Sequence, residues 1–214
     1  MKTRTLFVLV CSLALACVAG ASQVKAAERE RSEKEQKGVE ALMRLHKQFE
    51  ATEERAAQDY QSSAKGTLSG QIFVSTEGGE NFKLGAVQVS LFARDAIDAL
   101  LAGLKGYVDD FGVPGAKSGY SGYHTGGFYF SILGSPIQSV ETDADGKFVI
   151  EIPKTGPFVI AAQAQRRVGE KRERYYWLQP VSLEGQQQRV QNLSNNNLTS
   201  TTGTSSLIHT IESL

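Results

Sequence analysis

The chain has 214 residues, of which 41% are hydrophobic and 21% are charged, and this composition is typical of one folded domain with additional segments. It excludes a wholly disordered chain, a collagen and a polytopic membrane protein. The 23 Lys and Arg residues balance the 23 Asp and Glu residues, so the overall charge gives no indication of a nucleic-acid partner, and we expect none.

The N-terminus has the three-part pattern of a secretory signal peptide. Lys2 and Arg4 precede an apolar run of fourteen residues, and small residues follow. Fourteen helical residues span about 21 Å, less than the roughly 30 Å hydrocarbon core of a bilayer. We therefore expect residues 1–21 to be removed, with cleavage after Ala26 as the alternative. The predicted product is an exported protein, periplasmic or extracellular, with no transmembrane span after processing.

Both cysteines, Cys11 and Cys17, lie in this segment. The exported chain then holds no cysteine, which excludes disulfides and cysteine-ligated metals from it. The sequence Leu15-Ala16-Cys17 resembles the end of a lipobox, which would make Cys17 a lipidated anchor. Because Ala14 is a poor residue for the first lipobox position, ordinary signal-peptide cleavage is favoured over lipidation.

Residues 28–61 predict a long charged amphipathic helix. Half of the 32 residues from 28 to 59 are charged, and none is proline. An apolar stripe is best developed after Gly38. In one interpretation the second half of the helix docks on the next domain or the helix is an exposed spacer; in the other it forms a coiled coil that makes an oligomer. His46 and Glu53 occupy core positions of the heptad register, which favours the first interpretation.

The composition changes to β-forming residues after the helix, and we expect a β domain over residues 66–198. Apolar residues alternate with polar ones in 67–76 and 85–93, which predicts strands of a half-buried antiparallel sheet. Residues 143–146 predict a tight turn between two later strands. The full pattern indicates about seven strands, and residues 199–214 are expected to form a Ser/Thr-rich tail.

The strand pattern is interrupted by an insertion at residues 94–135. Asp95 is expected to cap a short helix over 96–104, and a segment in which glycines alternate with aromatic residues follows. The favoured interpretation is a mobile hairpin whose aromatic side chains cover the edge of the sheet domain or the N-terminal helix. The alternative is contact with a sugar ring or a peptide. The candidate ligand contacts are Tyr120, Tyr123, His124 and Phe128.

The sequence offers no assembled catalytic or metal-binding motif, so we predict no catalytic residues, no cofactor and no metal. It has three histidines, but it lacks the H-E-x-x-H pattern of a zinc hydrolase and the G-x-S-x-G pattern of a serine hydrolase. Asp143 and Asp145 fit a solvated turn better than a calcium loop. Residues 175–177 are three consecutive aromatics, so they must point to both faces of a strand, and we expect at least one in the core.

Three stretches resemble the carboxypeptidase regulatory-like domains: Gly70-Gln71-Ile72-Phe73-Val74, the segment 142–148, and Gly156-Pro157-Phe158-Val159-Ile160. Domains of this family are prealbumin-like β-sandwiches of about seven strands in two sheets. The resemblance covers residues 66–198 without the insertion. It implies a seven-stranded antiparallel sandwich, mainly β, and it implies no chemistry. Three further stretches, 78–85, 175–178 and 193–198, are similar to a set of bacterial exported proteins that carry such a domain and have no assigned activity, so they imply bacterial export.

These observations favour a non-enzymatic exported β-sandwich module with a structural or adaptor role in the bacterial envelope. Its expected partner is an envelope polymer or another envelope protein. The first alternative is a glycan- or peptide-binding protein that uses the aromatic insertion, and the second is an uncharacterised hydrolase.

Overall fold

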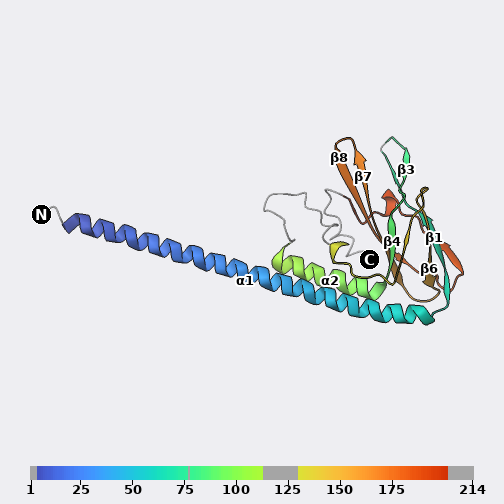
Figure 1. The fold of residues 1–214 in the computed structure, drawn as a ribbon, viewed down its shortest axis with the longest axis horizontal. Coiled ribbons are helices and arrows are strands. Elements are labelled where there is room, and N and C mark those ends of the chain that lie inside the picture. Colours follow the sequence, from blue (N-terminus) through green and yellow to red (C-terminus); the bar gives the residue numbers. More distant parts are fainter. Residues whose placement is uncertain (1–3, 77, 113–129, 202–214) are drawn as a thin grey trace. The chain divides into compact units, whose positions relative to one another are not determined.

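The computed structural model describes residues 4–76, 78–112 and 130–201. The chain divides into two compact units, residues 1–42 and 43–214. Helix α1 (Arg4–Ser62) supplies the described part of the first unit and continues into the second, which also holds helix α2 (Arg94–Phe111) and all the strands (Figure 1). The expected long N-terminal helix is confirmed. Within the described ranges, neither helix contains an apolar stretch of membrane-spanning length.

The first unit has a highly charged and exposed helical surface from residue 28 onward. Arg29 pairs with Glu33 at 3.2 Å, and Arg31 pairs with Glu35 at 3.0 Å, each at i,i+4 spacing. All four side chains are more than half exposed, so each pair contributes only about 0.3–0.5 kcal/mol to the stability of the helix.

The strands form a three-stranded sheet in the order β6-β1-β9, a five-stranded sheet in the order β10-β8-β7-β4-β5, and the hairpin β2-β3. All pairs are antiparallel except β1 with β9. The strands and the 3-10 helix are β1 (Lys65–Gln71), β2 (Phe73–Ser75), β3 (Asn81–Lys83), β4 (Gln88–Ala93), β5 (Gln138–Glu141), β6 (Lys147–Pro153), β7 (Phe158–Val168), β8 (Lys171–Val181), β9 (Gln188–Val190), η1 (Asn195–Asn197) and β10 (Ser200–Thr201).

The described residues form more strands than the roughly seven that the sequence predicts. The expected strand over 67–76 breaks at Ile72, because the partner strand β6 has its end here at the 143–146 turn and the chain changes partner. The N–H of Ile72 donates to the carbonyl of Gly146 at 2.8 Å, and its carbonyl accepts from the N–H of Leu84 at 2.9 Å. Beyond this point the chain pairs with β3 instead of β6. The first residues of the expected tail also differ, since β10 pairs with β8.

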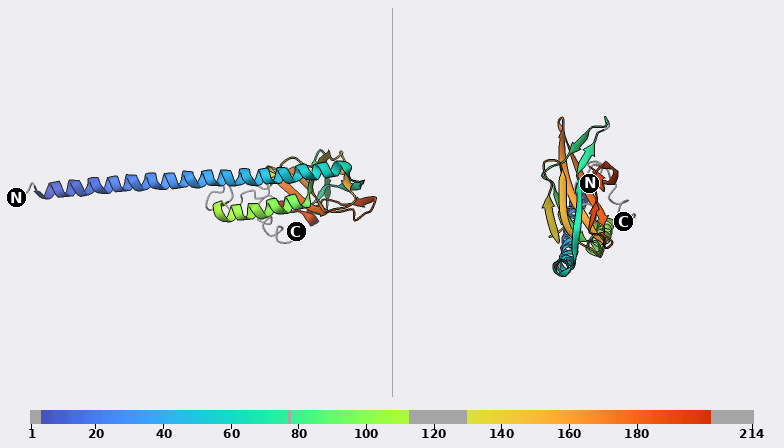
Figure 2. Two further views of the ribbon diagram at one scale, coloured as in Figure 1. Left: turned by 90° about the horizontal axis from the view of Figure 1, so that it is seen from below. Right: turned by 90° about the vertical axis from the view of Figure 1, so that its right-hand side faces the viewer.

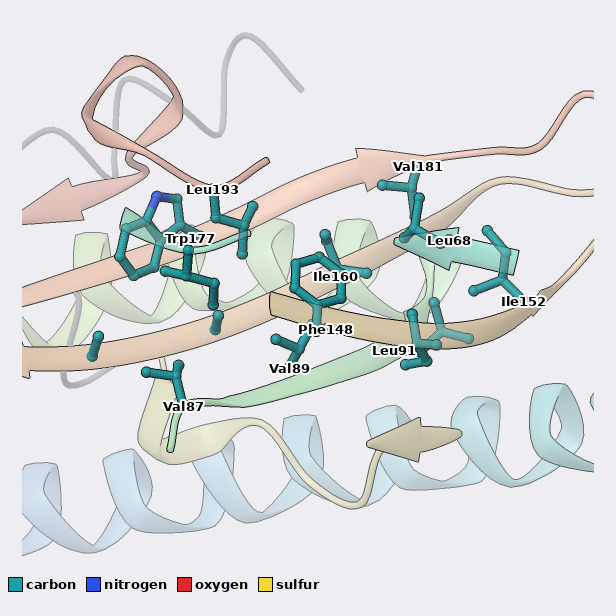
Figure 3. Packing of buried hydrophobic residues seen from close by; sticks show 14 of the residues in the cluster. Leu68, Val87, Val89, Leu91, Phe148, Ile152, Ile160, Trp177, Val181 and Leu193 are labelled. Atoms are coloured by element: carbon teal, nitrogen blue, oxygen red, sulfur yellow. The ribbon is translucent and has the colours of Figure 1, made fainter. Parts of the chain in front are cut away.

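The main hydrophobic core lies between the three-stranded and the five-stranded sheet, as Figure 3 shows. Alternate residues of β1, β4, β6, β7 and β8 point into it, which follows from the two-residue period of a strand. Trp177 is fully buried there, and its indole N–H donates to the carbonyl of Ser194 at 3.0 Å. The labelled members of the core are Leu68, Val87, Val89, Leu91, Phe148, Ile152, Ile160, Trp177, Val181 and Leu193. Burial of each aliphatic side chain contributes about 1.5–3 kcal/mol to folding.

The opposite face of the five-stranded sheet, which we call the outer face, is partly covered by helices. Figure 2 shows α2 beside the C-terminal part of α1. Phe49 of α1 packs on Phe92 of β4 with ring centroids 5.8 Å apart. The second half of the predicted helix therefore docks on the sheet domain, as the first of the two interpretations of this helix expects. The buried residues of α2 are Ala96, Ile97, Leu100, Leu101 and Leu104.

Helix α2 differs from the short helix predicted over 96–104. It continues through Gly103, which packs closely on Leu45 of α1. A Cβ atom added to this glycine would lie only 2.3 Å from Cδ2 of Leu45, so the close contact requires glycine. The helix ends where Gly112 adopts a φ of 79°. The prediction that Asp95 caps the helix is wrong. The cap position is Ala93, which has no side-chain cap of its own, and its N–H is bonded by Glu53 of α1.

Candidate ligand-binding groove

Polar side chains follow the outer face of two neighbouring strands. Val89 and Leu91 of β4 point into the core, so the alternate residues Gln88 and Ser90 face outward. In the antiparallel pair β4–β7, Ser90 lies opposite Ala161. Outward-facing residues of the two strands therefore lie next to each other on the same face.

A hollow of about 390 Å³ lies over this part of the outer face. Its polar side chains are amides and a hydroxyl, and its apolar walls include the rings of Phe92 and Phe130. None of the described residues that line it is acidic or basic. The lining residues are Gln88, Ser90, Phe92, Phe130, Leu133, Gly134, Pro136, Ala161, Ala162 and Gln163.

A second hollow of about 420 Å³ borders the same residue, Gln163, from its other side along β7. Because four residues of a strand advance about 14 Å, the two hollows follow β7 from Ala161 to Gln165 over about this length. We call their union the outer groove. The second hollow is lined by Gly85, Ala86, Val87, Gln163, Ala164, Gln165 and Arg174.

The loop at one rim of the outer groove is held in place by a buried threonine. Thr142 is 4% exposed, and its Oγ1 accepts from the N–H of Val87 at 2.9 Å and donates to the carbonyl of Leu84 at 2.9 Å. Its carbonyl accepts from the N–H of Ala86 at 3.1 Å. These bonds hold Ala86 in the left-handed region, with a φ of 56°. A non-glycine residue keeps this conformation only where its surroundings impose it, and such positions are frequent at ligand sites.

Tyr176 of β8 packs against two residues that line the first hollow. Tyr176 pairs with Gln163 across β7 and β8, and its ring packs against Phe130 at 5.1 Å. Its Oη is buried and has no hydrogen-bond partner in the described part of the chain. Most buried hydroxyls in proteins are bonded, so this group is an exception among the described residues.

The three consecutive aromatics take the arrangement that the sequence predicts. Tyr175 and Trp177 belong to the main core, with their rings stacked at 6.1 Å, whereas Tyr176 lies on the outer face. All three are buried, so none forms an exposed aromatic contact surface.

A separate hollow of about 420 Å³ lies where α1, the start of α2 and the β6–β7 turn meet, and it is acidic and partly apolar. Asp59 and Asp95 are among its lining residues. Tyr60 also lines it, donates to Oε1 of Gln138 and to the carbonyl of Glu151, and has a pKa raised by burial. This hollow offers fewer neutral polar side chains than the outer groove does.

Glu53 of α1 is buried next to Ala93, the residue at which β4 ends and α2 begins. Its side chain is bonded to Ala93 at 2.9 Å through Oε1, while Oε2 is buried without a partner among the described residues. The pKa of Glu53 is raised to about 8, mainly because burial removes the carboxylate from water. The N–H of Ala93 lowers this pKa and the charge of nearby Asp95 raises it.

The two aspartates of the 143–146 turn serve the turn itself. Oδ1 of Asp143 accepts from the N–H groups of Asp145 and Lys147 at 2.9 and 2.8 Å, and Gly146 has a φ of 74°. Asp145 pairs with Lys83 at 2.7 Å, and this hydrogen bond lowers the pKa of the Asp145 carboxyl. No group of three metal-ligating side chains gathers within residues 4–76, 78–112 and 130–201.

The predicted ligand contacts Tyr120, Tyr123, His124 and Phe128 lie outside the described residues. The outer groove uses other residues, which sequence reasoning did not single out. The alternation over 85–93 predicts only a strand of a half-buried sheet. Nothing in the local pattern distinguishes an exposed face from the floor of a groove.

Comparison with known proteins identifies no family profile and no curated protein that matches the chain. Among solved structures, the fold resembles the crystal structure of a Pseudomonas aeruginosa protein provisionally described as carbohydrate-binding. The identity is 17% and the TM-score is 0.40, and the match covers 66% of this chain and 96% of that chain.

Proposed function

We propose that this protein is an exported, non-enzymatic binding module that holds a glycan in the outer groove. The finer fold belongs to this proposal: the three-stranded and five-stranded sheets form a prealbumin-like β-sandwich of the carboxypeptidase regulatory-like type, with the hairpin β2-β3 as an addition to it. The expected site of action is the bacterial envelope, with an envelope polymer as ligand.

The observation that carries the proposal is the lining of the first hollow. Amide groups and a serine hydroxyl both donate and accept hydrogen bonds, which is what a ring of sugar hydroxyls requires. The half-buried ring of Phe130 supplies apolar surface for the C–H face of a sugar. A volume of about 390 Å³ lies in the range of small-ligand sites.

The same lining favours binding over catalysis. General acid–base chemistry needs a carboxylate, an imidazole or another titratable group within hydrogen-bonding reach of the reacting atom. Among the described residues that line the outer groove, the only charged side chain is Arg174, and none is a carboxylate or an imidazole. A groove with these groups can orient a ligand without transforming it.

The proposal is tested by isothermal titration of the purified protein with a panel of neutral and acidic oligosaccharides. We expect saturable binding to at least one member, and about tenfold weaker binding in Gln163→Ala, because this amide borders both hollows. Gln188→Ala is the matched control, since Gln188 is an exposed strand glutamine of the other sheet. Absence of binding across the panel, or equal losses in the two variants, would contradict a glycan site here.

A further inference from the structure

The charge of the outer groove is confined to one end. Arg174 lines the second hollow, whereas the first hollow is lined by neutral residues only. Neither hollow has an aspartate or a glutamate among its lining residues. A ligand that fills both hollows therefore meets neutral hydrogen-bonding groups at one end and a guanidinium at the other.

We propose that the ligand is an acidic saccharide of at least two rings, which places the carboxylate of a uronic acid on Arg174 and a neutral ring over Gln88, Ser90 and Gln163. This inference rests on the proposed function, because it specifies the class of glycan that the same groove takes.

The register of the β7–β8 pair places Arg174 at the correct position for this role. Arg174 lies opposite Gln165, two residues beyond Gln163 on the same face of β7. The distance from Ala161 to Gln165 is about 14 Å along an extended strand, which exceeds the length of one sugar ring. The neutral and charged ends of the groove thus suit neighbouring or alternate rings of one chain.

The chemistry of the arginine explains why a carboxylate is favoured over a hydroxyl. A guanidinium has five N–H donors in a planar fork, so it can hold both carboxylate oxygens while it keeps another partner. Arg174 is only partly exposed, and a charge-assisted hydrogen bond in such surroundings is shorter and stronger than a neutral one. The groove should therefore distinguish a uronic acid from the same sugar without its charge.

The matched ligands for the test are trigalacturonic acid and its fully methyl-esterified form, which have the same rings and linkages and differ in charge. We expect the purified protein to bind the acid at least about tenfold more tightly than the ester in isothermal titration. This preference should weaken when salt is raised from about 50 mM to about 500 mM, because the added ions screen a partly exposed pair.

The discriminating variant is Arg174→Gln, with Arg55→Gln on the exposed face of α1 as the matched control. We expect Arg174→Gln to bind the acid as weakly as the wild type binds the ester, with ester affinity unchanged. Arg174→Lys should recover part of the preference, because it keeps the charge without the fork. Circular dichroism of each variant checks that the fold is retained.

Three results would overturn the inference, and they separate it from the proposed function. Equal affinity for the acid and the ester leaves a glycan site but no acidic specificity. A preference that survives in Arg174→Gln assigns the carboxylate to another residue. Inorganic phosphate that competes as well as the saccharide acid shows an anion site without recognition of the sugar. Binding of neither saccharide, together with none in the oligosaccharide panel, refutes the proposed function itself.

Discussion

The buried carboxyl group of Glu53 makes the stability of the sheet domain depend on pH in a direction opposite to that of most carboxylates. Glu53 is 3% exposed, and burial raises its pKa to about 8 from 4.5. The folded protein therefore keeps a proton that the unfolded chain releases above about pH 4.5. Stability from this group is fully present below that pH and is lost as the pH rises toward 8.

The magnitude follows from the number of protons released on unfolding. Each pH unit in this window changes the free energy of unfolding by up to about 1.4 kcal/mol. Between about pH 5 and about pH 8 this amounts to roughly 4 kcal/mol, which local relaxation around the carboxylate reduces to about 2–4 kcal/mol. Glu53→Gln removes the ionisation while its amide oxygen can still accept from the N–H of Ala93.

The assay is urea unfolding of the wild type and of Glu53→Gln at about pH 5 and about pH 8. We expect the two proteins to differ by less than about 1 kcal/mol at the lower pH, because both side chains are then neutral. At the higher pH the variant should be more stable by about 2–4 kcal/mol. Glu54→Gln, on the exposed side of the same turn, is the control and should show no such change. A difference between wild type and Glu53→Gln that is the same at both pH values would refute the reasoning.

Three further substitutions test the packing and the rim of the groove by urea unfolding. Thr142→Val keeps the shape but leaves the N–H of Val87 unpaired, so we expect a loss of about 1–3 kcal/mol. Ala86→Gly relieves the strain of a left-handed backbone conformation, so it should stabilise the protein by about 0.5–1 kcal/mol. An unchanged or lower stability of this variant would show that Ala86 is not strained. Gly103→Ala should destabilise by about 1–3 kcal/mol through contact with Leu45, and Leu45→Ala should reduce that penalty in the double variant.

The sequence predicts features that depend on neighbouring residues. The 143–146 turn forms because Asp143 bonds main-chain groups two and four residues ahead and because glycine adopts a positive φ. The alternation in β4 correctly indicates which residues enter the core. Both signals are local, so a single sequence is sufficient to detect them.

Features that depend on distant segments are not predictable in this way. The N–H group of Ala93 at the start of α2 is bonded by Glu53, which lies 40 residues earlier in the chain. Local rules assign the cap to Asp95, the nearest suitable side chain, and therefore miss the cross-helix bond. The break at Ile72 has the same origin, since its partners Gly146 and Leu84 approach only in the folded chain.

The outer groove follows from polarity gradients that run in opposite directions along two strands. In β4 the outward residues change from polar to apolar, from Gln88 to Phe92, whereas in β7 they change from apolar to polar, from Val159 to Gln165. Antiparallel pairing brings the two apolar ends together, with Phe92 opposite Val159 under the helices, and it brings the two polar ends together beyond them. Each strand alone shows only a half-buried face. The pairing joins the exposed amides into one surface, and this makes a ligand site a reasonable expectation for a face that the helices cover only in part.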